Sequence, residues 1–276
     1  MVALSRPNTL RVLAYHGVPS TGRFADQLDW LTRHTTVVAL EDVRSHILSG
    51  SALPPRPVLI TFDDGDPTVL THALPLLRSR GLPAVAFIIA GLVDSDLPFW
   101  WAEVEHLVKD RPGTAANVVR ELKTLPDGER RERIARLRGA SRHLATPQLT
   151  SSDVRRLRDG GVAIGNHSLT HPCLDRCDDE TLRREVGEAH ERLSDVLGEA
   201  PVAFAYPNGN VDARVEACVA GSGYDLGFAF DHRVVRGRPH PLRVSRIRVD
   251  SDAPMDTFRI RVSGLHPALH AARGGR

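Results

Sequence analysis

Carboxylates and imidazoles follow directly on predicted strands, and they are the side chains of this sequence best suited to chemistry. One apolar run leads into Asp63 and Asp64, and another is followed by His167 and His171. Unpaired charges are costly where a buried strand ends, so adjacent carboxylates there indicate a bound metal or water. One aspartate and two histidines supply three protein ligands and leave a position open for water, the pattern of catalytic zinc. A second aspartate beside them can act as a base on that water.

Spacing alone is weak evidence for such a site. The sequence has 13 histidines, and its tail carries a second His-x3-His pair, His266 and His270, which follows no predicted strand and is interpreted as surface. Adjacent aspartates also form ordinary turns and helix caps. Placement at strand ends favours the first set, because catalytic groups of parallel α/β folds lie just beyond the carboxyl ends of the strands.

Two other strand ends carry unusual residues. The first strand runs into His16, and a later one runs through Tyr206 into Pro207 and the turn residue Gly209. A Tyr-Pro step before a glycine turn can direct a backbone N–H or carbonyl into a site, whereas its simplest interpretation is an ordinary turn. A lone histidine is more often structural than catalytic.

The strands that would position these groups alternate with amphipathic helices. Apolar, β-branched runs predict strands at residues 10–15, 37–40, 57–62, 84–89, 162–164, 202–206, 226–230 and 246–249. Periodicity and caps predict helices at residues 24–34, 41–48, 68–80, 179–197 and 212–220, with a short helix ending at Gly160. This alternation predicts an α/β fold with a parallel sheet and outer helices, closing into a barrel. Residues 94–145 break the rhythm and are predicted to be a helical insertion.

Composition excludes several classes of protein. The chain has 276 residues, 41% hydrophobic and 25% charged, with a formal net charge of +2. These values are typical of a soluble globular protein, and we expect one catalytic domain over residues 1–276 with its core at about 10–262. Near-neutral charge without a dense basic run argues against a nucleic-acid partner and fits a neutral sugar better than a polyanion.

Neither a membrane span nor a secretion signal is evident in the sequence. No apolar stretch approaches the ~18 residues that a span requires, and the N-terminus lacks a charged start followed by a long apolar segment. The three cysteines are an odd number and form no disulfide framework. The default expectation is a reduced, cytoplasmic protein with a cytoplasmic substrate, and the sequence predicts no oligomeric state.

Three segments together resemble the motifs of the polysaccharide deacetylases, the NodB-homology family also called carbohydrate esterase family four. The segments are residues 61–65 (TFDDG), 167–171 (HSLTH) and 204–209 (FAYPNG), in that order along the chain. The resemblance implies a deformed (β/α)7 barrel and metal-dependent removal of N-acetyl, sometimes O-acetyl, groups from sugars. The expected partner is therefore an N-acetylated sugar.

The same resemblance implies roles for individual residues. It implies Asp63 as the general base, and Asp64, His167 and His171 as the metal ligands. The backbone N–H of Tyr206 would help to stabilise the oxyanion. The expected cofactor is a divalent metal, with Zn2+ first and Co2+, Ni2+ or Mn2+ as alternatives.

The sequence departs from the common family pattern at several positions, among them Asp66 and Asn208, where many members have an aromatic residue. Ala205 stands where many members have an arginine, and the late Leu-x-His motif that supplies the acid is not evident at residues 242–249. A branch of the family, similar to poly-N-acetylglucosamine deacetylases, carries that histidine in an N-terminal Tyr-His pair. Tyr15 and His16 match this pair, and the aromatic residues 99–101 match the same branch. The resemblance therefore implies His16 as the general acid.

Other functions stay open at this point. The same site could hydrolyse another amide or ester, such as a formyl-amino sugar, a cyclic imide or an O-acetyl sugar. A barrel that binds a sugar without turnover predicts no stoichiometric metal. A structural zinc site at His171, Cys173 and Cys177 has permitted ligand spacing but no obvious fourth ligand.

Overall fold

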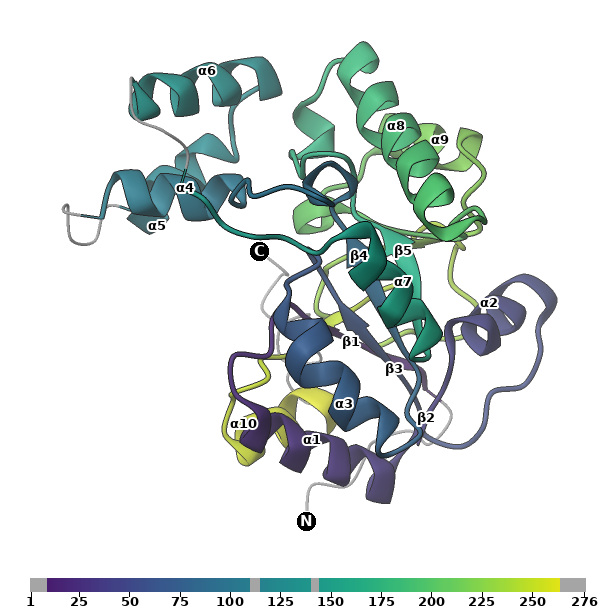
Figure 1. Ribbon diagram of the computed structural model, residues 1–276. Helices are drawn as coiled ribbons and strands as arrows, with labels where there is room; N and C mark the ends of the chain where they lie inside the picture. The colour runs from purple at the N-terminus through teal and green to yellow at the C-terminus, as the bar shows by residue number, and fades with distance from the viewer. Residues whose placement is uncertain (1–8, 110–114, 140–143, 264–276) are drawn as a thin grey trace.

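Parallel strands form one curled sheet through the centre of the molecule (Figure 1). The computed structural model describes residues 9–109, 115–139 and 144–263. The strands are β1 (Arg11–Tyr15), β2 (Thr36–Val37), β3 (Pro57–Phe62), β4 (Ala84–Ile88), β5 (Val162–Asn166), β6 (Ala203–Ala205), β7 (Leu226–Phe228) and β8 (Ile247–Arg248). Their order across the sheet is β7-β6-β5-β4-β3-β1-β8, with β2 paired beside β3.

Helices connect successive strands and cover the outside of the sheet. They are α1 (Thr21–His34), α2 (Leu40–Ser49), α3 (Leu74–Arg78), α4 (Trp100–Leu107), α5 (Ala115–Leu122), α6 (Asp127–Arg138), α7 (Ser151–Asp159), α8 (Asp179–Leu197), α9 (Ala213–Gly221) and α10 (Met255–Ser263). Helix α1 packs beside α3 and α10, and α8 packs between α7 and α9 (Figure 1). The sheet with its flanking helices forms a half-barrel, which confirms the predicted deformed (β/α)7 fold class.

Burial on both faces explains the continuous apolar runs in the sequence. Strands β1, β3 and β4 are buried at every position, as expected for a parallel sheet. Successive residues face opposite sides, so that Leu13 and Ile60 belong to one core cluster while Val12 and Leu59 belong to another. The sheet therefore has a core on each face, and polar groups are displaced to its ends.

One predicted helix, at residues 68–80, is divided. A π-helical turn at Val69–Ala73 precedes α3, and the Leu74 N–H donates to the carbonyl of Val69. Pro75 explains the irregularity, because it has no N–H with which to continue the α-helical pattern.

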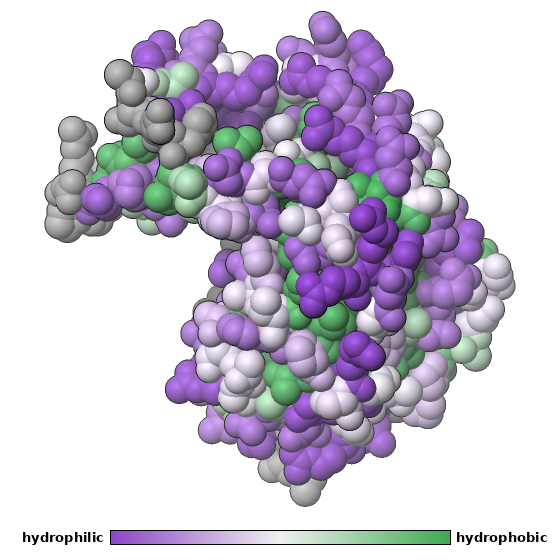
Figure 2. Space-filling view, viewed as in Figure 1, coloured by the Kyte–Doolittle hydropathy of each residue, from purple (hydrophilic) through white to green (hydrophobic). Residues whose placement is uncertain are grey.

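The predicted insertion lies between β4 and β5 and contains α4, α5 and α6. Val104, Leu122 and Ile134 form a small core between these helices. Figure 1 shows the three helices projecting to one side of the sheet, and Figure 2 shows a mostly hydrophilic face with a recess between them and the rest of the molecule. The insertion is therefore placed to form one wall of a site at the strand ends.

Three further sequence predictions concern a membrane span, the tail histidines and the number of domains. No helix in the described ranges is both long enough and apolar enough to cross a membrane. The tail pair His266 and His270 lies outside the described residues. The assignment of residues 1–276 to one domain stays a prediction.

Candidate active site

The three expected metal ligands converge beyond the carboxyl ends of β3 and β5. Oδ1 of Asp64 lies 3.4 Å from Nε2 of His167 and 3.5 Å from Nε2 of His171. Two atoms bound to one tetrahedral metal at roughly 2.0–2.2 Å are about 3.4 Å apart, so these separations suit a single ion. Among the described residues, Asp64, His167 and His171 form the group of possible metal ligands whose ligand atoms all lie within 4.8 Å of one another.

Hydrogen bonds hold the imidazole of His167 and the backbone of His171 in place. Nδ1 of His167 lies 2.7 Å from the carbonyl oxygen of Ala205. A proton on Nδ1 leaves the lone pair of Nε2 directed toward the ligand cluster, the arrangement usual for metal-bound histidine. The backbone N–H of His171 donates to Oγ of Ser168 at 2.9 Å, and Nε1 of Trp100 donates to the His171 carbonyl at 3.0 Å.

The backbone is strained where these motifs turn. Asp64, Ser168, His171 and Asn208 have φ angles of 71°, 67°, 58° and 56°. Non-glycine residues seldom adopt this left-handed conformation, and such strain gathers at functional sites because the surrounding structure must hold it. The three sequence motifs are thus fixed as turns that present side chains to a common space.

Burial and neighbouring charges set the protonation states of the three expected ligands. Burial lowers the pKa of His171 to about 3, which keeps its imidazole neutral. Burial also raises the pKa of Asp64, but the imidazoles of His167 and His171 outweigh this effect and hold the pKa below its usual range. Burial lowers the pKa of His167, but Asp63 and Asp64 outweigh this effect and hold the pKa above its usual value. Ionised carboxylates and neutral imidazoles are the forms that bind metal, so a metal would bind at His167 in place of a proton.

Two buried polar atoms at the cluster lack partners in the described part of the chain. They are Oδ1 of Asp64 and Nδ1 of His171. Leaving a carboxylate oxygen buried without a partner is costly, and a cation between Asp64 and the two imidazoles would remove that cost. The residues present therefore fit a divalent metal.

The neighbouring carboxylate, Asp63, is bound by an arginine from the other end of the chain. Nη1 and Nη2 of Arg246 lie 2.6 and 2.9 Å from the two carboxylate oxygens of Asp63. Arg246 is fully buried and its guanidinium lies over the rings of Phe87 and Phe230 at 5.3 and 5.6 Å. Burial raises the pKa of Asp63, but Arg246, with help from His167, holds the pKa below its usual range.

Sequence reasoning missed Arg246. The sequence predicts a strand at residues 246–249 without a role in the site, and no Leu-x-His motif is evident at residues 242–249. The available signal was an arginine at the start of a predicted strand that alternates arginines with apolar residues, together with Ala205 at a position where the family commonly has an arginine. The structure supplies an arginine to Asp63 from the residue that immediately precedes β8 instead.

His16 and Tyr206 also reach the site. His16 lines the same cavity as Asp63 and lies close enough to both aspartates to contribute to their electrostatics. Tyr206 lines the cavity too, but its N–H donates to the Phe228 carbonyl at 3.0 Å and its hydroxyl donates to the Leu242 carbonyl at 3.0 Å. That N–H is engaged between β6 and β7, so it could reach an oxyanion only after leaving this bond.

The cavity around these groups has a volume of about 440 Å³. Its inner wall is made by the strand-end residues, and its outer wall comes from the insertion. The lining residues from the insertion are Trp101, Glu105, Val119 and Lys123, while Asn208, Phe230 and Arg248 complete the rim. The sequence predicts a helical insertion in the barrel but does not predict that the insertion lines the site.

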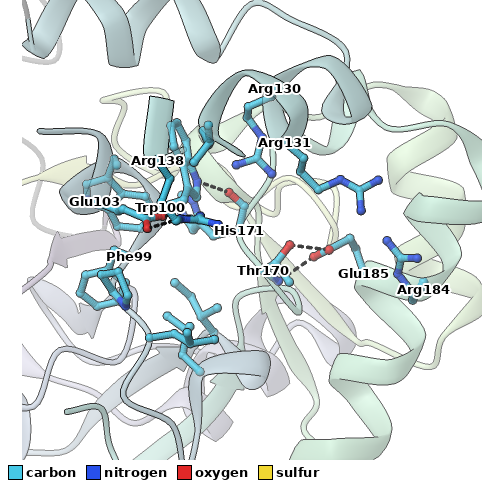
Figure 3. A pocket seen from close by; sticks show the side chains of 16 residues that line it. Phe99, Trp100, Glu103, Arg130, Arg131, Arg138, Thr170, His171, Arg184 and Glu185 are labelled. Carbon is cyan, nitrogen blue, oxygen red and sulfur yellow. Dashed lines mark hydrogen bonds and ion pairs between the residues drawn. The ribbon is translucent and has the colours of Figure 1, made fainter. Parts of the chain in front are cut away.

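A second cavity, of about 380 Å³, adjoins the first between the insertion and α8 (Figure 3). The two cavities share Trp101 and His171 in their linings. The ring of Trp101 lies 4.6 Å from the imidazole of His171, and the guanidinium of Arg130 lies 4.7 Å from the centre of the Trp100 ring. The insertion therefore contacts the imidazole of His171 through Trp101 and its backbone carbonyl through Trp100.

The cysteines do not join His171 in a ligand set within the described chain. Sγ of Cys177 donates to the Cys173 carbonyl, and Sγ of Cys173 accepts from the amide of Asn208 at 3.6 Å. Burial raises the pKa of both thiols, that of Cys177 to about 12. They are packed as protonated thiols, so the structure does not support the alternative of a structural zinc site.

Comparisons with known proteins agree with this geometry. The sequence model described as "Polysaccharide deacetylase" matches residues 50–227. A poly-beta-1,6-N-acetyl-D-glucosamine N-deacetylase of Staphylococcus aureus strain MSSA476 is 35% identical over 78 residues, which are 28% of this chain and 27% of that protein. Chitin deacetylase 1 of Cryptococcus neoformans is 31% identical over 83 residues, 30% of this chain and 17% of that protein. The matched segments thus span only about a quarter or less of these relatives.

Solved structures share the fold over most of the chain. A Streptococcus pyogenes deacetylase, PplD, in complex with acetate has a TM-score of 0.67 at 17% identity, covering 92% of this chain and 97% of that one. IcaB from Ammonifex degensii has a TM-score of 0.66 at 21% identity, covering 94% and 98%. The family match includes Asp63, Asp64, His167 and His171, and on this evidence the chain belongs to the polysaccharide deacetylase family.

Proposed function

We propose that this protein is a metal-dependent hydrolase that removes the N-acetyl group from an amino sugar or its glycoconjugate. The observation that carries the proposal is the meeting of two different carboxylates in one cavity. Asp64 faces two imidazoles at metal-ligand spacing, whereas Asp63 is held by Arg246. A site with one carboxylate for a metal and one for a proton is suited to hydrolysis.

Asp64, His167 and His171 would hold the metal. Zn2+ is the first expectation for two histidines and a carboxylate, and Co2+, Ni2+ and Mn2+ are alternatives. When bound, such a metal polarises the acetyl carbonyl and lowers the pKa of its water.

Asp63 is the proposed general base. The Arg246 guanidinium keeps its carboxylate ionised and fixes its orientation through two hydrogen bonds. An ionised, positioned carboxylate can accept the proton of the attacking water. Because Arg246 acts through Asp63, it is a positioning residue.

His16 is the proposed general acid. It lines the cavity with Asp63, and an imidazole can carry a proton near neutral pH. The leaving amine of an amide needs a proton before it departs, and His16 would supply it. Tyr206 keeps a place in the wall of the site, but its N–H is bonded to Phe228 and takes no step in this mechanism.

The test measures metal content and acetate release together. The substrates are β-1,6-linked N-acetylglucosamine oligomers, chosen from the printed activity of a relative, and simple N-acetylated hexosamines. We expect Asp64→Ala to lose both metal and activity, while Asp63→Asn keeps the metal and loses roughly 100-fold or more of the rate. Near wild-type acetate release by Asp63→Asn would show that the base assignment is wrong.

The same assays separate the remaining alternatives. Formate release or a ring-opened product would assign the site to a formyl-amino sugar or a cyclic imide, and acetate from O-acetylated sugars would assign it to an esterase. Sugar binding without stoichiometric metal or any product would favour the non-catalytic barrel.

A further inference from the structure

Lys123 is an unusual residue in this chain and is placed at an unusual point. The sequence has only two lysines, Lys109 and Lys123. Lys123 directly follows α5, is half-buried, and reaches the cavity that contains Asp63 and Asp64. The insertion therefore delivers one ammonium group to the mouth of the site.

The hydrogen bonding of this ammonium is incomplete. Its Nζ donates to Oδ1 of Asn208 at 2.6 Å, and the Asn208 amide in turn contacts Sγ of Cys173 at 3.6 Å. An ammonium has three donors, and no carboxylate of the described residues lies within ion-pair distance of Lys123. The bond to Asn208 fixes the position of the charge without neutralising it.

A second cation faces the same cavity from β8. Arg248 lines the cavity, its side chain is 55% exposed, and its contact with Asp250 is long, at 3.4 Å. Burial lowers the pKa of Lys123, and the nearby charge of Arg248 lowers it further. Asp64 and Glu105 act in the opposite direction; Glu105 is an exposed residue of α4 that lines the cavity without pairing with Lys123. Two cations that line one cavity, one bonded to a neutral amide and the other to a carboxylate through a single long contact, favour an anion between them.

We propose that Lys123 and Arg248 form a subsite for an anionic substituent, a phosphate or a carboxylate, on the amino sugar that the protein hydrolyses. This inference rests on the proposed function and narrows its substrate class. A cavity of about 440 Å³ is within the range of small-molecule sites. The metal ligands lie deep and buried, whereas Lys123 and Arg248 lie nearer the surface, so the acetyl group and the anionic substituent would occupy opposite ends.

An anionic sugar differs from the neutral sugar that the net charge of the whole chain favours. A formal charge of +2 over the whole chain fits a neutral sugar. The cavity mouth, however, concentrates two cations whose partners are a neutral amide and one long contact. The local arrangement is the better guide to the ligand, because charges beyond about 8–10 Å are largely screened at physiological salt.

The test is a binding measurement that needs no turnover. Metal-loaded protein is titrated by calorimetry with glucosamine, glucosamine 6-phosphate, glucosamine 1-phosphate and muramic acid, all of which lack the acetyl group. We expect at least one anionic sugar to bind about tenfold more tightly than glucosamine, and the advantage to shrink with added NaCl. The phosphate and carboxylate arms decide which substituent the subsite takes.

Matched variants localise the effect. Lys123→Met removes the charge with little change in shape, and Lys123→Arg keeps the charge. We expect Lys123→Met and Arg248→Gln each to remove most of the preference for the anionic sugar, while Lys123→Arg retains part of it. Lys109→Met, the matched change at the other lysine, should leave the preference intact.

The outcomes separate this inference from the proposed function. Equal binding of glucosamine and the anionic sugars, no binding by any anionic sugar, or an unchanged preference in Lys123→Met overturns the subsite. If the preference depends on Lys123 but no acetylated sugar is hydrolysed, the subsite stands and the proposed function fails. If neutral sugars are deacetylated as efficiently as anionic ones by both wild type and Lys123→Met, the function stands and the subsite fails.

Discussion

At the scale of single residues, the contact between Asp63 and Arg246 decides what the proposed base can do. Both side chains are almost completely removed from water, and both carboxylate oxygens accept a hydrogen bond from the guanidinium. Removing charges from water is costly, and two short parallel hydrogen bonds are the geometry that offsets this cost best. The ion pair therefore keeps the Asp63 carboxylate ionised and fixes its orientation.

Removal of one partner should destabilise the fold strongly. We expect Arg246→Met to lower the free energy of unfolding by about 3–5 kcal/mol, because Asp63 is left charged and buried. Urea denaturation of metal-free protein measures this. The double variant with Asp63→Asn should recover part of the loss, since it has no uncompensated charge. Equal losses in the single and double variants would contradict a direct coupling.

The same substitution should change the pH dependence of activity. The Arg246 guanidinium holds the pKa of Asp63 below its usual range, so its removal raises that pKa and protonates the base at a higher pH. We expect the acidic limb of the kcat/KM profile to move upward by about one pH unit or more in Arg246→Met. An unmoved acidic limb, with activity still measurable, would show that Asp63 is not the titrating base.

Residue-scale prediction from sequence succeeds for local motifs and fails for distant partners. Asp64 with His167 and His171 could be predicted because each follows a recognisable strand, and the three do converge. Arg246 is 183 positions away from Asp63, and the residues around Arg246 do not indicate which side chain it will contact. Lys123 was missed for the same reason. A lysine that follows a helix lines the site only because the insertion packs beside the strand ends.

At the scale of elements, the close packing of β5 against its neighbours sets the position of His167. A Cβ added at Gly165 would lie 2.5 Å from the Phe87 ring and 3.0 Å from the carbonyl of Ala203. The glycine therefore lets β4, β5 and β6 approach closely just before the strand delivers its histidine. Sequence patterns placed this strand but could not show which neighbour required the glycine.

A matched pair of glycine substitutions tests this packing. We expect Gly165→Ala to destabilise the protein by about 1–3 kcal/mol through overpacking and to reduce metal content, because β5 must shift. Gly187→Ala in α8, where nothing lies within 4 Å of the added Cβ, should be neutral or stabilising by up to about 1 kcal/mol. Similar stability and metal content in the two variants would contradict the packing argument.

Elements were predicted where local physics determines them. Buried strands appear as continuous apolar runs, and α8 is bounded by Asp178, whose side chain accepts from the Thr181 N–H, and by left-handed Gly198. The π-helical turn before Pro75 and the contact of the insertion with His171 depend on a single proline and on packing between distant segments. Those features could not be read from periodicity.

At the scale of the whole molecule, metal binding should be coupled to stability. The ligands lie after two separate strands, β3 and β5, and they come together only in the folded chain. A metal at 100 times its dissociation constant would stabilise the native state by about 2.7 kcal/mol, or several degrees in Tm for a protein of this size.

A thermal unfolding experiment checks this coupling. We expect chelation to lower Tm and added Zn2+ to restore it in wild type and in Asp63→Asn. Asp64→Ala should show no such response, because it lacks the carboxylate ligand. A response in Asp64→Ala equal to that of wild type would mean that the metal binds elsewhere.

The pairing of β1 with β8 has a consequence for the order in which the site is assembled during synthesis. Leu13 lies opposite Ile247 and Ala14 opposite Arg248, so β8 can dock on β1 only after residues 247–248 have been synthesised. A nascent chain that stops before residue 246 already carries Asp64, His167 and His171 but has no cation for Asp63. Arg246 immediately precedes β8, so the proposed base receives its arginine only after the three proposed metal ligands have been synthesised.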